Sequence, residues 1–253
     1  MNRLSPDSLF HFTSCFENLL GILDNTFYPR YCYEEFNLID KDKQQFAEDA
    51  FPMVCFCDIP LSQLMTHIET YGRYGLGMTK EWGIRKGLNP VIYFNKNSHM
   101  ANRLSVVTNG LLWSTNPVAQ AFYEVMLYIK PYEGILYRNG GAAKENIRFY
   151  DEHEWRYVPH RSVLKKNNME LSIQRHIYEH PEKLADANRK LETVETRLSF
   201  EADDIKYIII DEECQINEMV SKLRDIKSGR YDNEVIDRLA SRITTVKQIE
   251  SDF

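Results

Sequence analysis

The 253-residue chain has no run of about 18 apolar residues, the length that a membrane-spanning helix needs. It also lacks an excess of positive charge. Its 37 acidic and 31 basic side chains give a net charge of −6, which argues against a surface that coats nucleic acid. There is no internal repeat, low-complexity tract or obvious linker. With 43% hydrophobic and 27% charged residues, the composition is that of an ordinary globular protein.

Cysteine and glycine motifs for metals and nucleotides are missing too. The five cysteines, an odd number without a secretory leader, lead us to expect a reducing cytoplasm. Cys55 and Cys57 have no second ligand pair at zinc-like spacing, so we predict two buried thiols on a strand and no metal site. Gly72, Gly75 and Gly77 match neither the dinucleotide fingerprint nor the phosphate loop. They indicate backbone that is flexible or closely approached.

Hydrophobic periodicity predicts a mixture of strands and helices. We expect strands near residues 9–14, 53–57, 91–94, 134–138, 203–211 and 243–249. We expect helices near residues 16–23, 61–68, 79–86, 97–113, 116–129, 213–226 and 233–241. Residues 173–194 should also be helical, with an interruption at His180-Pro181. The strong buried-strand run at 203–211 comes late, so the tail should complete the same sheet. The predicted fold is one mixed α+β domain over residues 1–253, with residues 165–253 as an elaboration packed on the same core.

Two loop regions are candidates for recognition. Residues 25–49 are polar and aromatic, and long loops in compact domains are often functional. Tyr28, Arg30, Tyr31 and Tyr33 could clamp a ligand there, or form a packed aromatic cluster. The GGAAKEN tract at residues 140–146 is predicted to be an exposed loop that recognises substrate.

The stretch IRFYDEHEWRYVP at residues 147–159 carries the candidate chemistry. Its middle is predicted as a strand, and side chains alternate across a strand. One face would carry Glu152, Glu154 and Arg156, and a packed opposite face would carry the rings of His153, Trp155 and Tyr157. The charged face would project into a cleft, where two carboxylates can hold a ribose hydroxyl and take a proton, or form a solvated charged edge. In a cleft, we expect a modest rise in the pKa of at least one carboxyl, because Arg156 opposes it.

His11 ends the first predicted strand, just before a helix whose start reads as a capping box, Ser14 to Glu17. Helix N-termini suit anionic ligands because free backbone N–H groups and the helix dipole point there. The alternative is a structural histidine, hydrogen-bonded to a neighbouring loop.

Several motifs resemble those of known families. FHFTS, VCFCDIPLS, YGRYGLGMTKEWG, NPVIYF, EWRYVP and KYIIID, at residues 10–14, 54–62, 71–83, 89–94, 154–159 and 206–211, resemble the bacterial AbiGi family over nearly the whole chain. AbiGi proteins are named for abortive phage resistance and are commonly labelled antitoxins. LFHFTS together with EHEWR also resembles the DarT-like branch of the ADP-ribosyltransferase fold.

The transferase resemblance implies roles for individual residues. His11 would bind NAD, the substrate, with Thr13 as its neighbour, and Tyr71 or Tyr74 would stack on nicotinamide. Glu154 would be the catalytic carboxylate. Glu152 is a second candidate on the same face, and Arg156 would lie beside them at the NAD site. Cleaving the nicotinamide–ribose bond develops an oxocarbenium-like cation, which a carboxylate bound to the ribose 2′-hydroxyl stabilises.

Two functions remain open. The chain is a cytoplasmic ADP-ribosyltransferase that acts in phage defence or in a toxin–antitoxin pair, transferring ADP-ribose from NAD to an unidentified acceptor. Alternatively, it is a catalytically degenerate transferase fold that acts as an antitoxin and binds a cognate toxin or a phage protein. The first reading predicts that His11 and Glu154 line one pocket.

Overall fold

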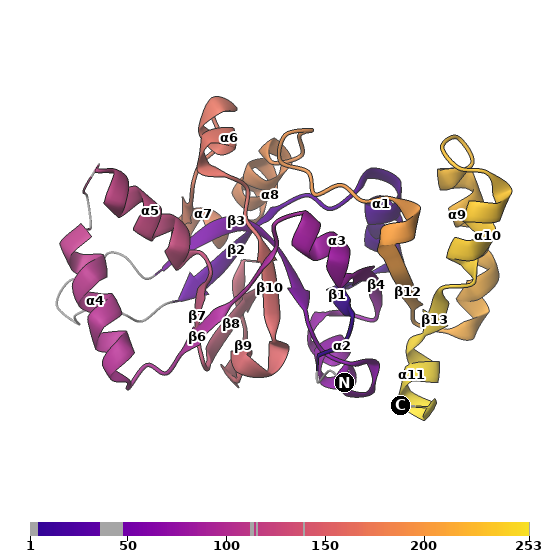
Figure 1. The fold of residues 1–253 in the computed structure, drawn as a ribbon, viewed down its shortest axis with the longest axis horizontal. Helices are drawn as coiled ribbons and strands as arrows, with labels where there is room; N and C mark the ends of the chain where they lie inside the picture. Colours follow the sequence, from indigo (N-terminus) through magenta and orange to yellow (C-terminus); the bar gives the residue numbers. More distant parts are fainter. Residues whose placement is uncertain (1–4, 36–47, 112–113, 115, 139, 253) are drawn as a thin grey trace. The chain divides into compact units, whose positions relative to one another are not determined.

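The structure is a computed structural model that describes residues 5–35, 48–111, 114, 116–138 and 140–252 (Figure 1). The chain divides into two compact units. The first comprises Met1–Phe27, Cys55–Leu88 and Leu198–Phe253, and the second comprises Tyr28–Val54 and Asn89–Arg197. The division falls inside strand β3 (Glu48–Cys57), and whether the two units behave as one domain stays a prediction.

The first unit is built on strands from both ends of the chain. The strand order is β13–β12–β4–β1, with β1 antiparallel to β4, β4 antiparallel to β12, and β12 parallel to β13. The bounds are β1 (Ser8–Thr13), β4 (Tyr74–Thr79), β12 (Ile205–Ile210) and β13 (Ile243–Thr245). The prediction that the tail completes the sheet begun near the N-terminus is therefore confirmed.

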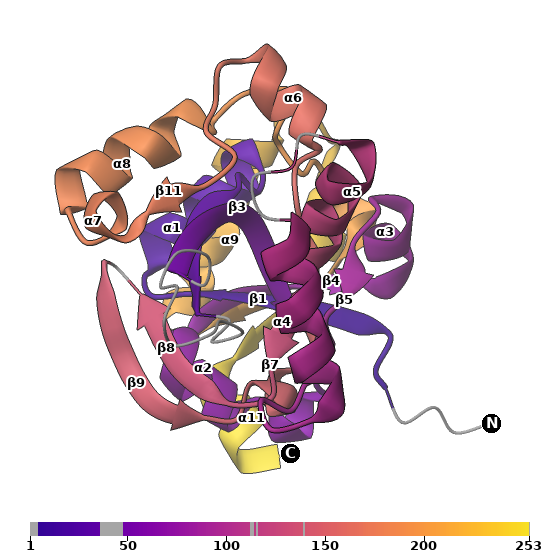
Figure 2. The same ribbon diagram turned by 90° about the vertical axis from the view of Figure 1, so that its left-hand side faces the viewer.

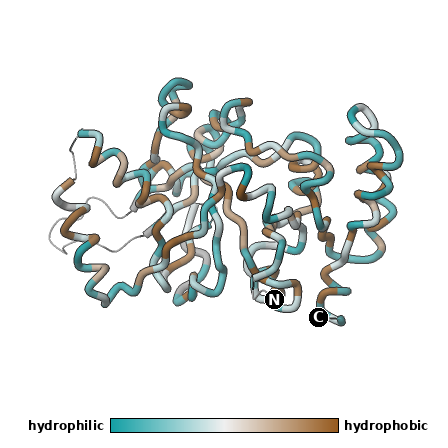
Figure 3. Tube along the Cα trace, viewed as in Figure 1, coloured by the Kyte–Doolittle hydropathy of each residue, from teal (hydrophilic) through white to brown (hydrophobic). Residues whose placement is uncertain are grey.

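The helices of the first unit lie before or after these strands in the sequence. They are α1 (Phe16–Asn25), α2 (Met65–Tyr71), α3 (Lys80–Arg85), α9 (Ile216–Lys227), α10 (Asn233–Ala240) and α11 (Val246–Asp252), with short 3-10 turns η1 (Leu61–Gln63), η3 (Ala202–Asp204) and η4 (Glu213–Gln215). Figure 3 shows hydrophobic and hydrophilic positions interleaved along α9 and α10, as expected for helices with one buried face. Met219 and Leu223 of α9, and Ile236 and Leu239 of α10, are buried.

The glycines of β4 leave room for neighbouring backbone and rings. A Cβ on Gly75 would lie 2.7 Å from the carbonyl oxygen of His11, and one on Gly77 would lie 2.7 Å from Cε1 of Phe10. Gly72 has φ +124°, and a Cβ there would lie 2.1 Å from the carbonyl oxygen of Thr13. The predicted close approach of backbone at these glycines is confirmed.

The second unit contains several smaller pairings. β2 (Arg30–Glu35) and β11 (Ile173–Gln174) are antiparallel to β3, and β10 (Glu154–Tyr157) is antiparallel to β5 (Asn89–Pro90). β6 (Ile92–Phe94) is parallel to β7 (Ile129–Pro131), and β8 (Gly134–Arg138) forms a curved hairpin with β9 (Gly141–Ile147) (Figure 2). The helices are α4 (His99–Leu111), α5 (Pro117–Met126), α6 (Arg161–Lys166), α7 (Arg175–Tyr178) and α8 (Pro181–Lys190), with the 3-10 turn η2 (Phe149–Glu152).

Four local predictions need correction. The tract at residues 140–146, predicted as a loop, is mostly strand β9, because β8 supplies its pairing partner. The N-cap of α1 is Cys15 without a side-chain hydrogen bond, so the capping box is wrong. The helical stretch predicted at residues 173–194 begins as strand β11, although its predicted interruption at His180-Pro181 is confirmed between α7 and α8. Residues 243–249 begin as β13 but continue into α11. Most of the polar segment predicted between residues 25 and 49, from 36 to 47, lies outside the described residues.

Strands and helices together confirm a mixed α+β fold. None of the described helices combines the length and the apolar character needed to cross a bilayer.

Candidate functional site

The candidate catalytic stretch is a short strand preceded by a 3-10 turn. Glu154 and Arg156 share one face of β10 and are only 4% and 0% exposed. Glu152, 8% exposed, ends η2 instead, and His153 separates it from the strand in a left-handed conformation with φ +44°. The shared face predicted for Glu154 and Arg156 is confirmed, but this face is buried. The alternative of a solvated charged edge is therefore wrong.

Arg156 is the centre of the site. Its Nε donates to Oε1 of Glu154 at 2.5 Å, and its Nη2 donates to Oε2 of Glu154 at 3.2 Å. Nη2 also donates to Oε1 of Glu34 on β2 at 2.7 Å, and Nη1 donates to the carbonyl oxygen of Leu127 at 2.8 Å. A planar guanidinium can hold several acceptors at once, which suits arginine to a fully buried position.

Lys130 of β7 supplies the second cation. Its Nζ donates to Oε2 of Glu154 at 2.7 Å and to Oε2 of Glu152 at 3.1 Å. The same ammonium lies 4.2 Å from the centre of the Phe149 ring. We call the five residues Glu34, Lys130, Glu152, Glu154 and Arg156 the buried charge cluster. All five belong to the second unit.

Sequence reasoning missed Glu34 and Lys130. A weak signal was present, because each lies in a strand among buried or aromatic side chains, where a charged group needs a partner. The sequence gives no indication of which partner that is.

Burial and the two cations shift the pKa values of the carboxyls in opposite directions. Burial alone would raise the pKa of Glu154, but Arg156 and Lys130 together outweigh it and hold that pKa well below its ordinary value. Burial raises the pKa of Glu34, and the same two cations offset this only in part. The predicted rise is therefore wrong for Glu154. It occurs at Glu34, a residue that we did not predict.

The backbone of Glu154 is also hydrogen-bonded. Its N–H donates to the hydroxyl oxygen of Tyr93 at 2.8 Å, and burial raises the pKa of Tyr93. Trp155 and Tyr157, predicted to be the packed face, are half-buried. The more deeply buried face of this strand is thus the charged one.

His11 lies in the first unit, where its contacts are those of a structural residue. Its Nδ1 is 2.8 Å from the carbonyl oxygen of Cys55, and its ring centre lies 5.2 Å from that of Phe27 and 5.5 Å from that of Phe56. This matches the structural alternative, with the partner on a strand. Oγ1 of Thr13 accepts a hydrogen bond from Nδ2 of Asn18 at 3.0 Å.

The two candidate tyrosines for nicotinamide also belong to the first unit. The ring centre of Tyr71 lies 4.3 Å from that of His67, and the hydroxyl oxygen of Tyr74 accepts a hydrogen bond from Nε2 of Gln215 at 3.0 Å. Glu152, Glu154 and Arg156 belong to the other unit, so the shared pocket of the transferase reading stays a prediction.

The tyrosines of β2 pack rather than line a ligand site. Tyr31 and Tyr33 are each 5% exposed and join a cluster with Tyr178, while Arg30 pairs with Glu192 at 2.6 Å. The packed aromatic alternative is confirmed for these two rings. Among the described residues, no group of three or more His, Cys, Asp or Glu side chains could hold a metal ion.

Fold and site together define a mixed α+β protein with a buried ion-pair centre. A family model described as "Putative abortive phage resistance protein AbiGi, antitoxin" matches residues 25–211. "Abortive phage resistance protein AbiGi" of Lactococcus lactis subsp. cremoris is 30% identical, covering 90% of this chain and 99% of that protein. The chain belongs to the AbiGi family. No solved structure matches it, so the ADP-ribosyltransferase fold stays a prediction.

Proposed function

We propose that this chain acts in phage defence as an antitoxin-type protein that binds a partner protein, and that Glu154 is a structural ion-pair residue. One observation carries this proposal. Both carboxylate oxygens of Glu154 already accept hydrogen bonds, from Arg156 and Lys130, in a site that is 4% exposed.

A catalytic carboxylate has to reach the proton or hydroxyl on which it acts. Freeing Glu154 for a ribose hydroxyl would separate it from two buried cations, and uncompensated buried charges are costly. The lowered pKa of Glu154 also makes it a poor proton acceptor, because general bases work best with a pKa near the ambient pH.

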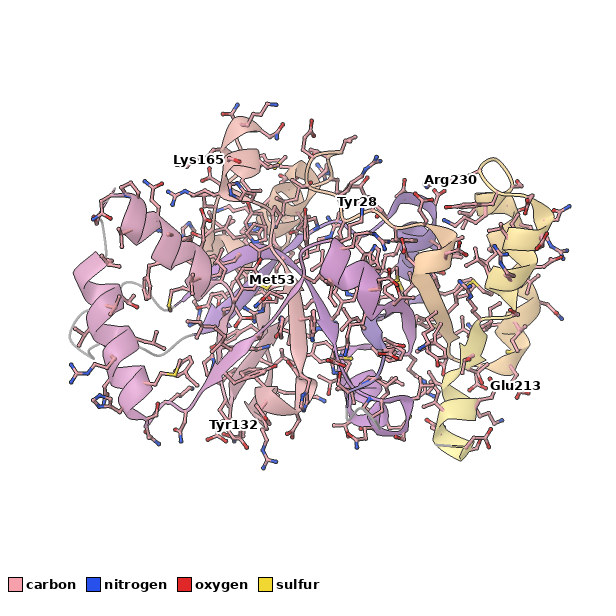
Figure 4. All side chains as sticks on the ribbon, viewed as in Figure 1. Tyr28, Met53, Tyr132, Lys165, Glu213 and Arg230 are labelled. Carbon is pink, nitrogen blue, oxygen red and sulfur yellow. The ribbon has the colours of Figure 1, made fainter. Side chains whose placement is uncertain are left out.

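The surface of the second unit offers side chains of the kind that protein interfaces use. Tyr132, labelled in Figure 4, is 37% exposed, and Tyr150 is 46% exposed. Their ring centres lie 5.6 Å apart, and the guanidinium of Arg148 lies 6.0 Å from the Tyr132 ring centre. Tyrosine and arginine are enriched where interfaces concentrate their binding energy.

Co-expression with the product of the neighbouring gene tests the proposal. We expect a complex that survives size-exclusion chromatography and that Tyr132→Ala combined with Tyr150→Ala weakens by about tenfold or more. Val194→Ala removes another exposed apolar side chain of the same unit and should leave the affinity unchanged. If the two proteins elute separately at micromolar concentration, partner binding of this kind is contradicted.

The second candidate function is ADP-ribosyl transfer from NAD. It is favoured by the gathering of Glu152 and Glu154 around one ammonium, with Arg156 alongside, because the transferase resemblance places its chemistry on these residues. Glu154 would act as the catalytic carboxylate, Glu152 as the second, and the acceptor is unidentified.

Labelled NAD discriminates the two functions. A transferase should release nicotinamide, and Glu154→Gln should abolish the release while Glu182→Gln, at an exposed position on α8, should not. We expect no release from the wild-type protein.

A further inference from the structure

The five residues of the buried charge cluster include more carboxyl groups than cations. Among the described residues the cluster holds three carboxyl groups, from Glu34, Glu152 and Glu154, and two cations, from Lys130 and Arg156. An unpaired charge in a buried site is costly, and a carboxyl group avoids this cost by keeping its proton.

The pattern of hydrogen bonds indicates which carboxyl keeps the proton. Glu154 accepts three hydrogen bonds from the two cations, and Lys130 also donates to Glu152. Glu34 accepts one, from Arg156, which also donates to Glu154 and to the carbonyl oxygen of Leu127. Arg156 therefore stabilises the charge of Glu154 more than that of Glu34, in agreement with the raised pKa of Glu34.

Other groups face Glu34 from the elements around it. Asp49 is its register partner on β3 and accepts a hydrogen bond from Oγ of Ser172 at 3.0 Å. Tyr178 of α7 interacts electrostatically with Glu34, and burial raises the pKa of Tyr178 to about 12, so it is neutral near pH 7. Arg138 of β8 and Cys32 of β2 act on that same tyrosine.

We propose that the buried charge cluster is a proton-binding site that holds one proton on Glu34 at neutral pH, and that losing this proton destabilises the second unit. A carboxyl whose pKa is raised by folding contributes stability at low pH and loses it as the pH rises through the folded pKa. The stability that the cluster gives to the second unit then falls as the pH rises. This property is independent of the proposed partner.

Carbon-13 NMR of the full chain, labelled at the glutamate carboxyl carbons, tests the proposal directly. We expect one glutamate resonance at the protonated position at pH 7, absent from Glu34→Gln and retained in the control Glu192→Gln. Ionisation of all glutamates at pH 7 overturns the proposal, and so does a protonated resonance that persists in Glu34→Gln. Failure of Glu34→Gln to fold counts against it too, because glutamine is a neutral isostere of protonated glutamate.

Thermal melting between pH 6 and pH 9 gives a second readout. We expect the melting temperature of the wild-type protein to fall more steeply with rising pH than that of Glu34→Gln. Parallel curves for the two proteins would show that Glu34 does not take up a proton on folding in this pH range, and they would overturn the proposed destabilisation.

Discussion

Replacing Arg156 with methionine should lower the free energy of unfolding by more than any surface substitution does. The guanidinium is 0% exposed and donates hydrogen bonds to Glu34, to Glu154 and to the carbonyl oxygen of Leu127. Methionine fills a similar volume but leaves these acceptors in the interior with one cation instead of two. Breaking a buried ion pair by removing one partner costs about 3–5 kcal/mol.

That cost corresponds to roughly two to four orders of magnitude in the unfolding equilibrium, since 1.4 kcal/mol is about a factor of ten. Urea denaturation followed by circular dichroism measures it. Arg30→Met is the matched control in the same unit, because the Arg30–Glu192 pair is 49% and 40% exposed and is worth about 0–1 kcal/mol. Arg156→Lys keeps the charge but loses the planar guanidinium that donates to several acceptors at once. Its cost should therefore fall between those of Arg156→Met and Arg30→Met. If Arg156→Met costs no more than Arg30→Met, the cluster does not stabilise the fold as we describe.

Two further predictions concern the packing of β4 and the loss of stability at acid pH. Gly75→Ala should destabilise by about 1–3 kcal/mol, because its Cβ would lie 2.7 Å from the carbonyl oxygen of His11. Gly21→Ala, in α1 with nothing within 4 Å, should instead stabilise by about 0.5–1 kcal/mol, and thermal melting distinguishes the two. The folded pKa of Glu154 is lowered, so its contribution is present above the unfolded pKa and is lost as the pH falls toward the folded value. Urea melts from pH 7 to pH 3 should therefore show a shallower acid loss for Glu154→Gln, and equal slopes would contradict this.

The strands that sequence reasoning located best have strong local patterns. The isoleucines of β12 are buried because a run of β-branched residues suits a strand covered on both faces. β9 was missed because glycine, alanine and lysine carry little strand preference, and its pairing with β8 supplies what the local sequence does not.

The candidate site could be predicted only in part for a related reason. Alternation along β10 places Glu154 and Arg156 on one face, which is a local property. Whether that face meets water or the interior depends on Glu34 and Lys130, which lie 122 and 26 residues from Arg156 in the sequence. Only the fold brings such distant residues together, so local patterns cannot reveal a buried charge cluster.

Calorimetric titration of NAD into the purified protein tests most directly whether Glu154 is structural. We expect no saturable heat at NAD concentrations up to the millimolar range, because the cations of the second unit already occupy this carboxylate. A saturable isotherm with micromolar affinity that Glu154→Gln abolishes, while the variant keeps its circular dichroism spectrum, would contradict the proposed structural role and favour the transferase.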